Sequence, residues 1–282
     1  MKLRPILFAG YFLFSGLLVF CQPKHESEKG KLFIIGGGDR SPELIKTMIA
    51  TAQLNSKDHI AILPMSGGEP DTSFHYIKIQ LEEFCNNTIA NLNFTKEYIN
   101  NKFWIDSLKK AKLIFITGGQ QTRFMEAVNN TPVYDAIQFA YKNGATIAGT
   151  SAGAAVMPEY MITGGELTDT VSRATFRKVH PENIELKAGL GLIKSVMIDQ
   201  HFIIRSRYNR LLSAIEKFPS YICIGIDEAT AIIITGNKAT VTGESQVIVI
   251  SDPKNLKVKN GLIKLSDVRF SLYTAGDTFK LK

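Results

Sequence analysis

Short apolar runs that alternate with amphipathic stretches are the feature that most narrows the folds open to this chain of 282 residues. The apolar runs predict strands at 31–35, 59–63, 112–116, 145–148, 195–198, 222–226 and 231–234. Helical spacing of apolar residues between the earlier runs predicts helices near 42–54, 72–84, 97–110, 121–128 and 132–143. This alternation is typical of an α/β fold in which helices cover both faces of a mostly parallel sheet.

The last part of the chain has a different pattern. From Lys238 onward, apolar residues such as those of 246–250 are separated by repeated Gly and Asn turns. This predicts a small antiparallel β segment at one edge of the sheet. Because there is no internal repeat or low-complexity linker, we expect residues 31–282, roughly 250 residues, to form one domain.

The stretch 146–157 combines an apolar strand, a cramped turn and a helix start made of small residues. Ser151 stands at the corner, between Gly149 and Gly153 in the spacing Gly-x-Ser-x-Gly. A turn of this kind holds the corner side chain clear of the sheet at a helix N-terminus, which is the geometry of a nucleophile elbow. A tight turn packed with small residues gives the same pattern, so the assignment of Ser151 as nucleophile depends on the rest of the chain.

A serine nucleophile needs a base, and the active site of an open α/β sheet lies beyond the carboxyl ends of the strands. His201 directly follows a predicted strand and opens a helix-like run at 202–212, so it is held on a rigid element at that edge. The other histidines lie in a polar N-terminal stretch, at a strand start, early in a helix and in a polar loop: His25, His59, His75 and His180. By elimination, His201 is the candidate base.

The base in turn needs an orienting carboxylate, and both Asp227 and Glu228 end the next strand at the same edge. Strand alternation directs one of them toward the site and the other away, but it does not say which. Negative charge on an attacked carbonyl would be met by backbone N–H groups. We expect Ala152 to supply one of them and Gly118 or Gly119 the other.

The run Gly36-Gly37-Gly38-Asp39 follows the first predicted strand. It does not complete the dinucleotide-binding pattern Gly-x-Gly-x-x-Gly, so it does not indicate a nucleotide site. We interpret it as backbone that must pass close to neighbouring loops.

Four ordered motifs resemble the cyanophycinase family of serine peptidases, peptidase family S51. The motifs are Gly118-Gly119-Gln120, Gly149-Thr150-Ser151-Ala152-Gly153-Ala154, Asp199-Gln200-His201-Phe202 with Arg205, Arg207 and Arg210 behind it, and Gly225-Ile226-Asp227-Glu228-Ala229-Thr230-Ala231. The family is related to the dipeptidase that cleaves after N-terminal aspartate, and its fold is akin to that of class I glutamine amidotransferases. The similarity runs from about Leu32 to Thr235.

The resemblance implies a Ser-His-Glu triad of Ser151, His201 and Glu228, and so favours Glu228 over Asp227. It also implies a substrate site lined by Gln120, Asp199, Gln200, Arg205, Arg207 and Arg210. The implied substrate is cyanophycin, a polyaspartate with arginine on each β-carboxyl group. Helical spacing keeps the three arginines off one face, because Arg205 and Arg207 diverge by about 200°; we therefore expect at least one to bind a structural carboxylate.

The N-terminus has the pattern of an export signal. Lys2 and Arg4 precede an uncharged run at 5–20 that is slightly short for a membrane span, so residues 1–20 are interpreted as a signal peptide. Cys21 stands where a bacterial lipoprotein is acylated, although Phe20 is bulky where such signals have a small residue. We expect an exported protein, periplasmic or extracellular, with residues 21–30 as a polar tether; plain secretion and an uncleaved anchor are the alternatives to lipidation.

Composition excludes several classes of function. The net charge of +7 is spread along the chain, which does not indicate nucleic-acid binding. Cys21, Cys85 and Cys223 form neither a disulfide framework nor a zinc spacing. Because protein groups fill every role in a triad mechanism, we expect no metal and no cofactor. The oligomeric state is left open, a homodimer included.

Beside the candidate site residues, the resemblance implies a serine-type exopeptidase that acts on aspartyl or β-linked Asp-Arg peptides through an acyl-enzyme. Three alternatives are an aspartyl dipeptidase acting on ordinary peptides, an ester or amide hydrolase of other specificity, and a non-catalytic binding module with the same fold.

Overall fold

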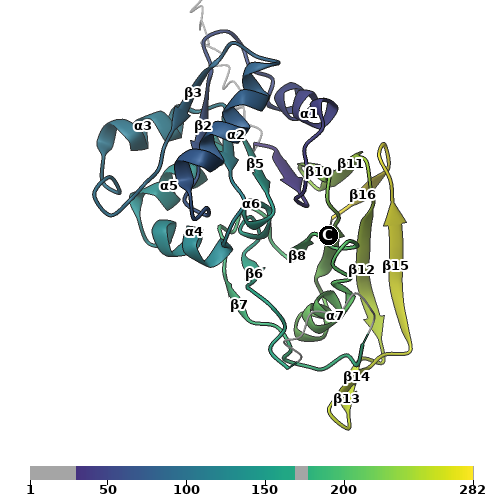
Figure 1. Cartoon of the computed structure of the whole chain (residues 1–282). Helices are drawn as coiled ribbons and strands as arrows, with labels where there is room; N and C mark the ends of the chain where they lie inside the picture. Colours follow the sequence, from purple (N-terminus) through teal and green to yellow (C-terminus); the bar gives the residue numbers. More distant parts are fainter. Residues whose placement is uncertain (1–29, 169–176, 282) are drawn as a thin grey trace, which may run out of the picture.

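The computed structural model describes residues 30–168 and 177–281 (Figure 1). The predictions for the export signal, Cys21 and nearly all of the tether fall outside this part of the chain. Gly30, the last residue assigned to the tether, is buried, and its N–H donates to the carbonyl of Tyr141 over 2.7 Å, so the packed chain begins at residue 30 or before it. No helix among the described residues has the length and apolar character needed to cross a bilayer.

A central sheet of eight strands has the order β16-β11-β10-β1-β5-β4-β2-β3. The strands β1, β5, β4, β2 and β3 run parallel, and β10, β11 and β16 extend the sheet in antiparallel fashion beyond β1. The bounds are β1 (Leu32–Ile35), β2 (His59–Leu63), β3 (Thr88–Asn91), β4 (Leu113–Ile116), β5 (Thr146–Thr150), β10 (Thr230–Thr235), β11 (Lys238–Gly243) and β16 (Thr278–Lys280).

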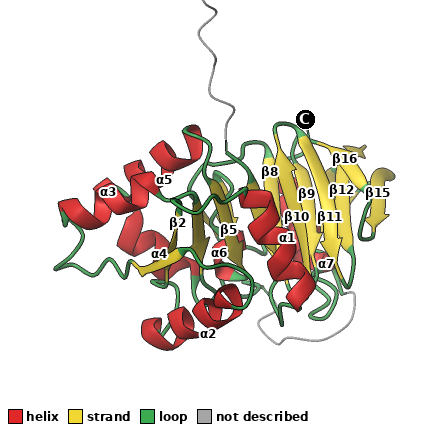
Figure 2. Cartoon of the chain, turned by 90° about the horizontal axis from the view of Figure 1, so that it is seen from above, coloured by secondary structure: helices red, strands yellow, loops and turns green. Residues whose placement is uncertain are grey.

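Helices cover both faces of the parallel part (Figure 2). One face packs against α1 (Pro42–Ala52) and α2 (Pro70–Glu82), and the other against α3 (Lys102–Lys110), α4 (Gln121–Val128) and α5 (Pro132–Lys142). Strands covered on both sides have to be largely apolar, which is why β1 and β4 are continuous apolar runs and why every residue of β1, β4 and β5 is buried. The predicted fold class, a mostly parallel sheet between helices with antiparallel strands at the C-terminus, is confirmed.

A second sheet of four strands, in the order β15-β12-β9-β8, packs on the α3–α5 side of the first through one shared core. Its parallel pair is β8 (Val196–Gln200) and β9 (Ile222–Ile226), continued by β12 (Val247–Lys254) and β15 (Asp267–Tyr273). The helix α7 (Tyr208–Lys217) covers its other face. The apolar runs at 195–198 and 222–226 are therefore strands, as predicted, but they belong to this second sheet.

The remaining elements are short. They are α6 (Ala152–Ala155), the pair β6 (Tyr160–Ile162) and β7 (Leu186–Ala188), and the hairpin β13 (Lys257–Lys259) and β14 (Leu262–Lys264).

Three local features differ from the predictions. The edge strand β3 was not predicted, because its residues are polar or only partly buried. The helix expected from 97 begins at Lys102, where the side chain of Asn101 caps it by accepting from the N–H of Trp104 at 3.1 Å. The helix expected after His201 begins only at Tyr208, because residues 201–206 form turns in which His201 and Ser206 have positive φ.

Candidate active site

Ser151 occupies the corner between β5 and α6, with φ 53° and ψ −108°. An L-residue rarely adopts this conformation, so the turn is strained. Its glycine neighbours make the corner possible: a Cβ on Gly149 would lie 2.6 Å from the carbonyl oxygen of Gly153, and one on Gly153 would lie 2.2 Å from that of Ile116. The Gly-x-Ser-x-Gly spacing thus reflects close backbone packing around a half-buried serine whose hydroxyl faces the site.

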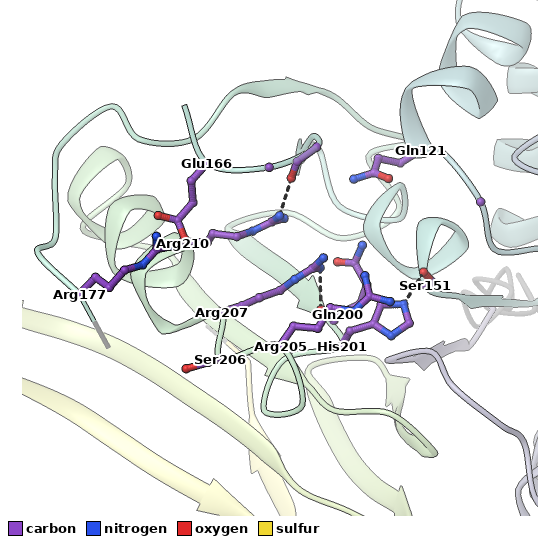
Figure 3. Close-up of a pocket in the computed structure, with 13 residues that line it drawn as sticks. Gln121, Ser151, Glu166, Arg177, Gln200, His201, Arg205, Ser206, Arg207 and Arg210 are labelled. Carbon is purple, nitrogen blue, oxygen red and sulfur yellow. Dashed lines mark hydrogen bonds and ion pairs between the residues drawn. The ribbon is translucent and has the colours of Figure 1, made fainter. Parts of the chain in front are cut away.

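Ser151, His201 and Glu228 form a continuous chain of hydrogen bonds. The Ser151 Oγ lies 2.7 Å from His201 Nε2, and His201 Nδ1 lies 2.5 Å from Glu228 Oε1 (Figure 3 shows the first of these). When Nδ1 carries the proton and donates it to the carboxylate, Nε2 is left as an acceptor for the serine hydroxyl. The three side chains come from the ends of β5, β8 and β9, so rigid strands from both sheets position them.

Asp227, the other carboxylate that the sequence offered, has a structural role. Its Oδ1 accepts from the N–H groups of Ile203 and Ile204, each at 3.0 Å, and its Oδ2 accepts from the hydroxyl of Ser245 at 2.7 Å. Asp227 therefore fixes the turns that follow His201, while Glu228 contacts the imidazole.

The surroundings of His201 favour its neutral form. Burial of the ring lowers its pKa, and the nearby guanidinium groups of Arg205 and Arg207 lower it further, against the opposing effect of Glu228. Because the pKa lies below the ordinary value of 6.5, the imidazole is neutral at pH 7 and can accept a proton.

The glycine run after β1 passes directly under the histidine and the glutamate. A Cβ on Gly37 would lie 2.3 Å from His201 Cε1, and one on Gly38 would lie 2.7 Å from Glu228 Cβ. The Gly36 carbonyl also accepts from the N–H of His201 at 2.8 Å. The close approach expected of this run is confirmed, and its neighbours are the imidazole and the carboxylate.

The expected oxyanion donors lie around the Ser151 hydroxyl. Ala152 is the first residue of α6, where a backbone N–H has no partner within the helix. A Cβ on Gly118 would lie 3.5 Å from Ser151 Cβ, so Gly118 is a direct neighbour of the serine. Within residues 30–168 and 177–281, the N–H groups of Gly118 and Gly119 have no acceptor. Both remain available to an oxyanion.

A cavity of about 310 Å³ opens beside Ser151 and His201 (Figure 3). Of the residues implied by the resemblance, four line it: Gln200, Arg205, Arg207 and Arg210. Gln120 and Asp199 do not. Gln120 is exposed at the start of α4, and its neighbour Gln121 faces the cavity, donating to the carbonyl of Ile162 at 2.9 Å.

Asp199 lies behind the cavity wall and is fully buried. Its carboxylate accepts from Arg210 Nε and Nη2 at 3.0 and 3.1 Å, and from Arg207 Nη1 at 3.2 Å. Two of the three arginines thus bind one structural carboxylate, and Asp199 acts on the cavity only through them. Arg205 is exposed and forms no ion pair with any described residue.

One residue of the lining, Glu166, had no signal in the sequence. Glu166 lines the cavity from an irregular segment after β6, where no motif marks it, and its carboxylate accepts from Arg177 Nη2 at 3.1 Å and from Asn183 Nδ2 at 2.7 Å. Gln200 is only 5% exposed, and its Oε1 has no hydrogen-bond partner among the described residues. Since buried polar atoms are nearly always paired, this oxygen is free to bind a donor on a ligand.

The other described histidines lie elsewhere. The ring of His59 contacts the carbonyl of Ser107 at 2.9 Å, and that of His180 contacts the carbonyl of Gly261 at 3.2 Å. In the described part of the chain, no group of three or more His, Cys, Asp or Glu residues could hold a metal ion.

Solved structures with this fold include peptidases. A peptidase from an acI-B1 actinobacterium superposes with a TM-score of 0.64 at 21% identity, covering 91% of this chain and 98% of that one. A putative peptidase E from Listeria monocytogenes gives a TM-score of 0.53 at 16% identity, covering 77% of this chain and all of that one. At these identities the likeness concerns the fold alone.

Sequence comparison goes further. A cyanophycinase from Trichormus variabilis is 32% identical over 270 residues, which are 91% of this chain and 87% of the relative. A cyanophycinase from Geminocystis herdmanii is 33% identical over 190 residues, which are 64% and 67% of the two chains. The family model described as Peptidase family S51 matches residues 32–242. The chain is therefore a serine-type hydrolase that belongs to peptidase family S51.

Proposed function

We propose that this enzyme is an exopeptidase of the cyanophycinase type, which hydrolyses aspartyl or β-linked Asp-Arg peptides through an acyl-enzyme on Ser151. The observation that carries the proposal is the unbroken hydrogen-bond chain from Ser151 Oγ through His201, at 2.7 Å, to Glu228, at 2.5 Å. A hydroxyl, a neutral base and an orienting carboxylate in this order are the parts that acyl transfer requires.

In the first step, Ser151 Oγ attacks the carbonyl carbon of the scissile amide while His201 Nε2 takes the hydroxyl proton. Glu228 keeps the proton on Nδ1 and stabilises the imidazolium that forms. The oxygen of the tetrahedral intermediate faces the N–H groups of Ala152 and of Gly118 or Gly119. When the C–N bond breaks, His201 gives its proton to the leaving amine.

In the second step, water takes the place of the amine. His201 removes a proton from the water, the hydroxide attacks the ester carbonyl, and the Ser151 oxygen leaves with the proton returned by His201. The acid product departs and the enzyme regains its starting state. The neutral imidazole favoured by the lowered pKa of His201 suits both proton removals.

The cavity supports a substrate with both anionic and cationic groups. Arg205, which has no ion pair among the described residues, and the outer part of Arg207 can bind a carboxylate with charge-assisted hydrogen bonds. The Oε1 of Gln200, which has no hydrogen-bond partner among the described residues, can accept from a guanidinium. A β-linked Asp-Arg unit carries both groups, and relatives at 32–33% identity are named cyanophycinases.

The test is incubation of the purified protein with cyanophycin, β-linked Asp-Arg oligomers and α-aspartyl peptides, with the product masses recorded. We expect β-Asp-Arg to be released, and Ser151→Ala and His201→Ala to abolish release. His180→Ala is the matched control, because that histidine lies on the surface with only a backbone carbonyl as partner. Activity that survives Ser151→Ala would overturn the mechanism, and release of free aspartate alone would indicate a dipeptidase.

Specificity is tested with a substrate pair that differs in one group. Replacing the aspartyl carboxylate by an asparaginyl amide removes its charge-assisted hydrogen bonds with Arg205 and Arg207, each worth about 1.5–3 kcal/mol. The kcat/KM should therefore fall by tens to thousands of fold, and Arg207→Leu should remove most of this difference. Equal rates on the two substrates would overturn the specificity and leave the hydrolase assignment unaffected.

A further inference from the structure

A second cavity, of about 480 Å³, opens on the other side of the candidate nucleophile. It lies between the carboxyl ends of β4 and β5 and the helix α2, and among the described residues only Ser151 lines both cavities. None of the arginines of the first cavity contributes to it. The scissile bond at Ser151 thus has a separate space on each side.

The second cavity is adjacent to the catalytic hydrogen bonds. Gly118, one of the oxyanion donors, lines it, and so does Gly37, whose backbone lies against the imidazole of His201. A substrate held at Ser151 with its carbonyl oxygen toward Gly118 could extend one portion into each cavity. The portion in the second cavity would lie next to the base that protonates the leaving amine.

Arg40 is the cation of this second cavity. Its Nε donates to Gln80 Oε1 at 2.8 Å, and it forms no ion pair with any residue of the described ranges. Asp39, which also lines the cavity, is exposed. Its carboxylate makes no direct ion pair with Arg40 but affects the Arg40 pKa electrostatically. Burial lowers the pKa of Arg40, which means that its charge is poorly solvated. A carboxylate on a ligand would pair with it.

Two buried hydroxyls also indicate that the second cavity binds a polar ligand. Thr117 and Thr150 line the cavity and are only 3% and 6% exposed, and the Oγ1 of each lacks a hydrogen-bond partner among the described residues. Natural structures seldom leave buried polar atoms unpaired, so a wall with two such hydroxyls indicates a site that is completed by a polar ligand.

We propose that the second cavity binds the leaving portion of the substrate and that Arg40 binds a free carboxylate on that portion. The inference rests on the proposed function, because it requires an acyl-enzyme on Ser151. In the acylation step the C–N bond breaks, the acyl group stays on Ser151 facing the first cavity, and the amine takes its proton from His201. The amine product then leaves through the second cavity with its carboxylate unchanged.

The test compares two β-linked Asp-Arg trimers that differ only at the C-terminal α-carboxyl group, which is free in one and a carboxamide in the other. For the wild-type enzyme we expect kcat/KM to be roughly thirty- to several thousandfold higher for the free acid, the range for a buried charge left unpaired. Arg40→Gln should bring the ratio of the two values close to one. Arg123→Gln is the matched control: Arg123 lies on α4, is exposed and lines neither cavity, so the ratio should stay at its wild-type value.

The outcomes separate the two proposals. Turnover that depends on Ser151 but is equal for acid and amide would overturn the leaving-group site alone, as would an Arg40→Gln enzyme that keeps the wild-type ratio. Failure of the wild-type enzyme to cleave either trimer would overturn the proposed substrate, and this inference with it. The wild-type comparison needs no variant, so it decides the question even if Arg40→Gln does not fold.

Discussion

Gly37 and His201 are in such close contact that a single methyl group would not fit between them. A Cβ on Gly37 would lie 2.3 Å from Cε1 and 2.6 Å from Nε2 of the imidazole. The imidazole of His201 is therefore held between the backbone of Gly37, which packs against the ring, and Glu228, which contacts Nδ1. The ring can keep its place between Ser151 and Glu228 only while residue 37 has no side chain.

Gly37→Ala should displace the imidazole and reduce kcat/KM at least about a hundredfold, since a shift of roughly 1 Å in a reacting group costs that much. Gly276→Ala is the control for backbone strain, because Gly276 also has a positive φ, 92° against 113°, but open space where its Cβ would lie. Kinetics at matched concentrations of folded enzyme check this. Equal effects of the two substitutions would mean that strain, not contact with His201, is responsible.

The strained backbone at Ser151 predicts an effect on the free energy of unfolding that is independent of the loss of the hydroxyl. Both Ser151→Ala and Ser151→Gly remove the hydroxyl and should abolish turnover. Only glycine adopts φ 53° and ψ −108° without strain, so Ser151→Gly should be more stable than Ser151→Ala by about 1 kcal/mol, even though glycine has the more flexible unfolded chain. Urea denaturation of the two variants measures the difference. Equal free energies of unfolding would show that the corner holds no strain.

The pH dependence of activity should respond to Arg205. Only neutral His201 accepts the serine proton, so kcat/KM falls as the pH drops through the histidine pKa, which burial, Arg205 and Arg207 together hold below 6.5. Removing the cation in Arg205→Gln raises that pKa, and the acid limb of the profile should move to higher pH. The limb should not move in Arg123→Gln, since Arg123 is not among the groups that shift the pKa of His201. An unmoved limb in Arg205→Gln would contradict this electrostatic account.

Asp199 should matter for stability more than any exposed acidic residue. Asp199→Asn leaves the side chains of Arg207 and Arg210, which are 16% and 5% exposed, without their shared countercharge. Breaking a buried pair in this way costs about 3–5 kcal/mol. The surface pair of Glu43 and Lys46 provides the control, because Glu43→Gln should cost less than about 0.5 kcal/mol. Denaturation curves of the two variants give the comparison, and similar losses would refute the structural role of Asp199.

Ser151 and His201, the proposed nucleophile and base, could be found in the sequence because each stands at the end of an apolar strand, where local geometry sets the place of the side chain. Glu228 could not be chosen in this way. The chain leaves the β conformation beyond Ile226, with positive φ at Ala229, so the alternation of the strand does not extend to Asp227 and Glu228. Glu228, which contacts His201, was indicated by the resemblance to a known family and not by the alternation of side chains along the strand.

The arginine site shows where prediction from spacing ends. Helical spacing correctly required at least one of Arg205, Arg207 and Arg210 to bind a structural carboxylate. It could not show that Arg207 and Arg210 share Asp199, because turns replace the expected helix up to residue 206. Those turns depend on the contacts of Asp227 with Ile203 and Ile204, which are distant in sequence. Glu166 and the second cavity likewise arise from tertiary contacts that no local pattern encodes.

The proposed nucleophile and its base follow strands of different sheets: Ser151 follows β5 in the first sheet, and His201 and Glu228 follow β8 and β9 in the second. The 2.7 Å contact between them thus crosses a seam in the molecule. Activity therefore depends on the relative position of the two sheets. A shift of about 1 Å of one sheet against the other would abolish turnover while every strand stayed folded. On heating, we expect kcat/KM to fall at a lower temperature than the circular dichroism signal of the β-strands.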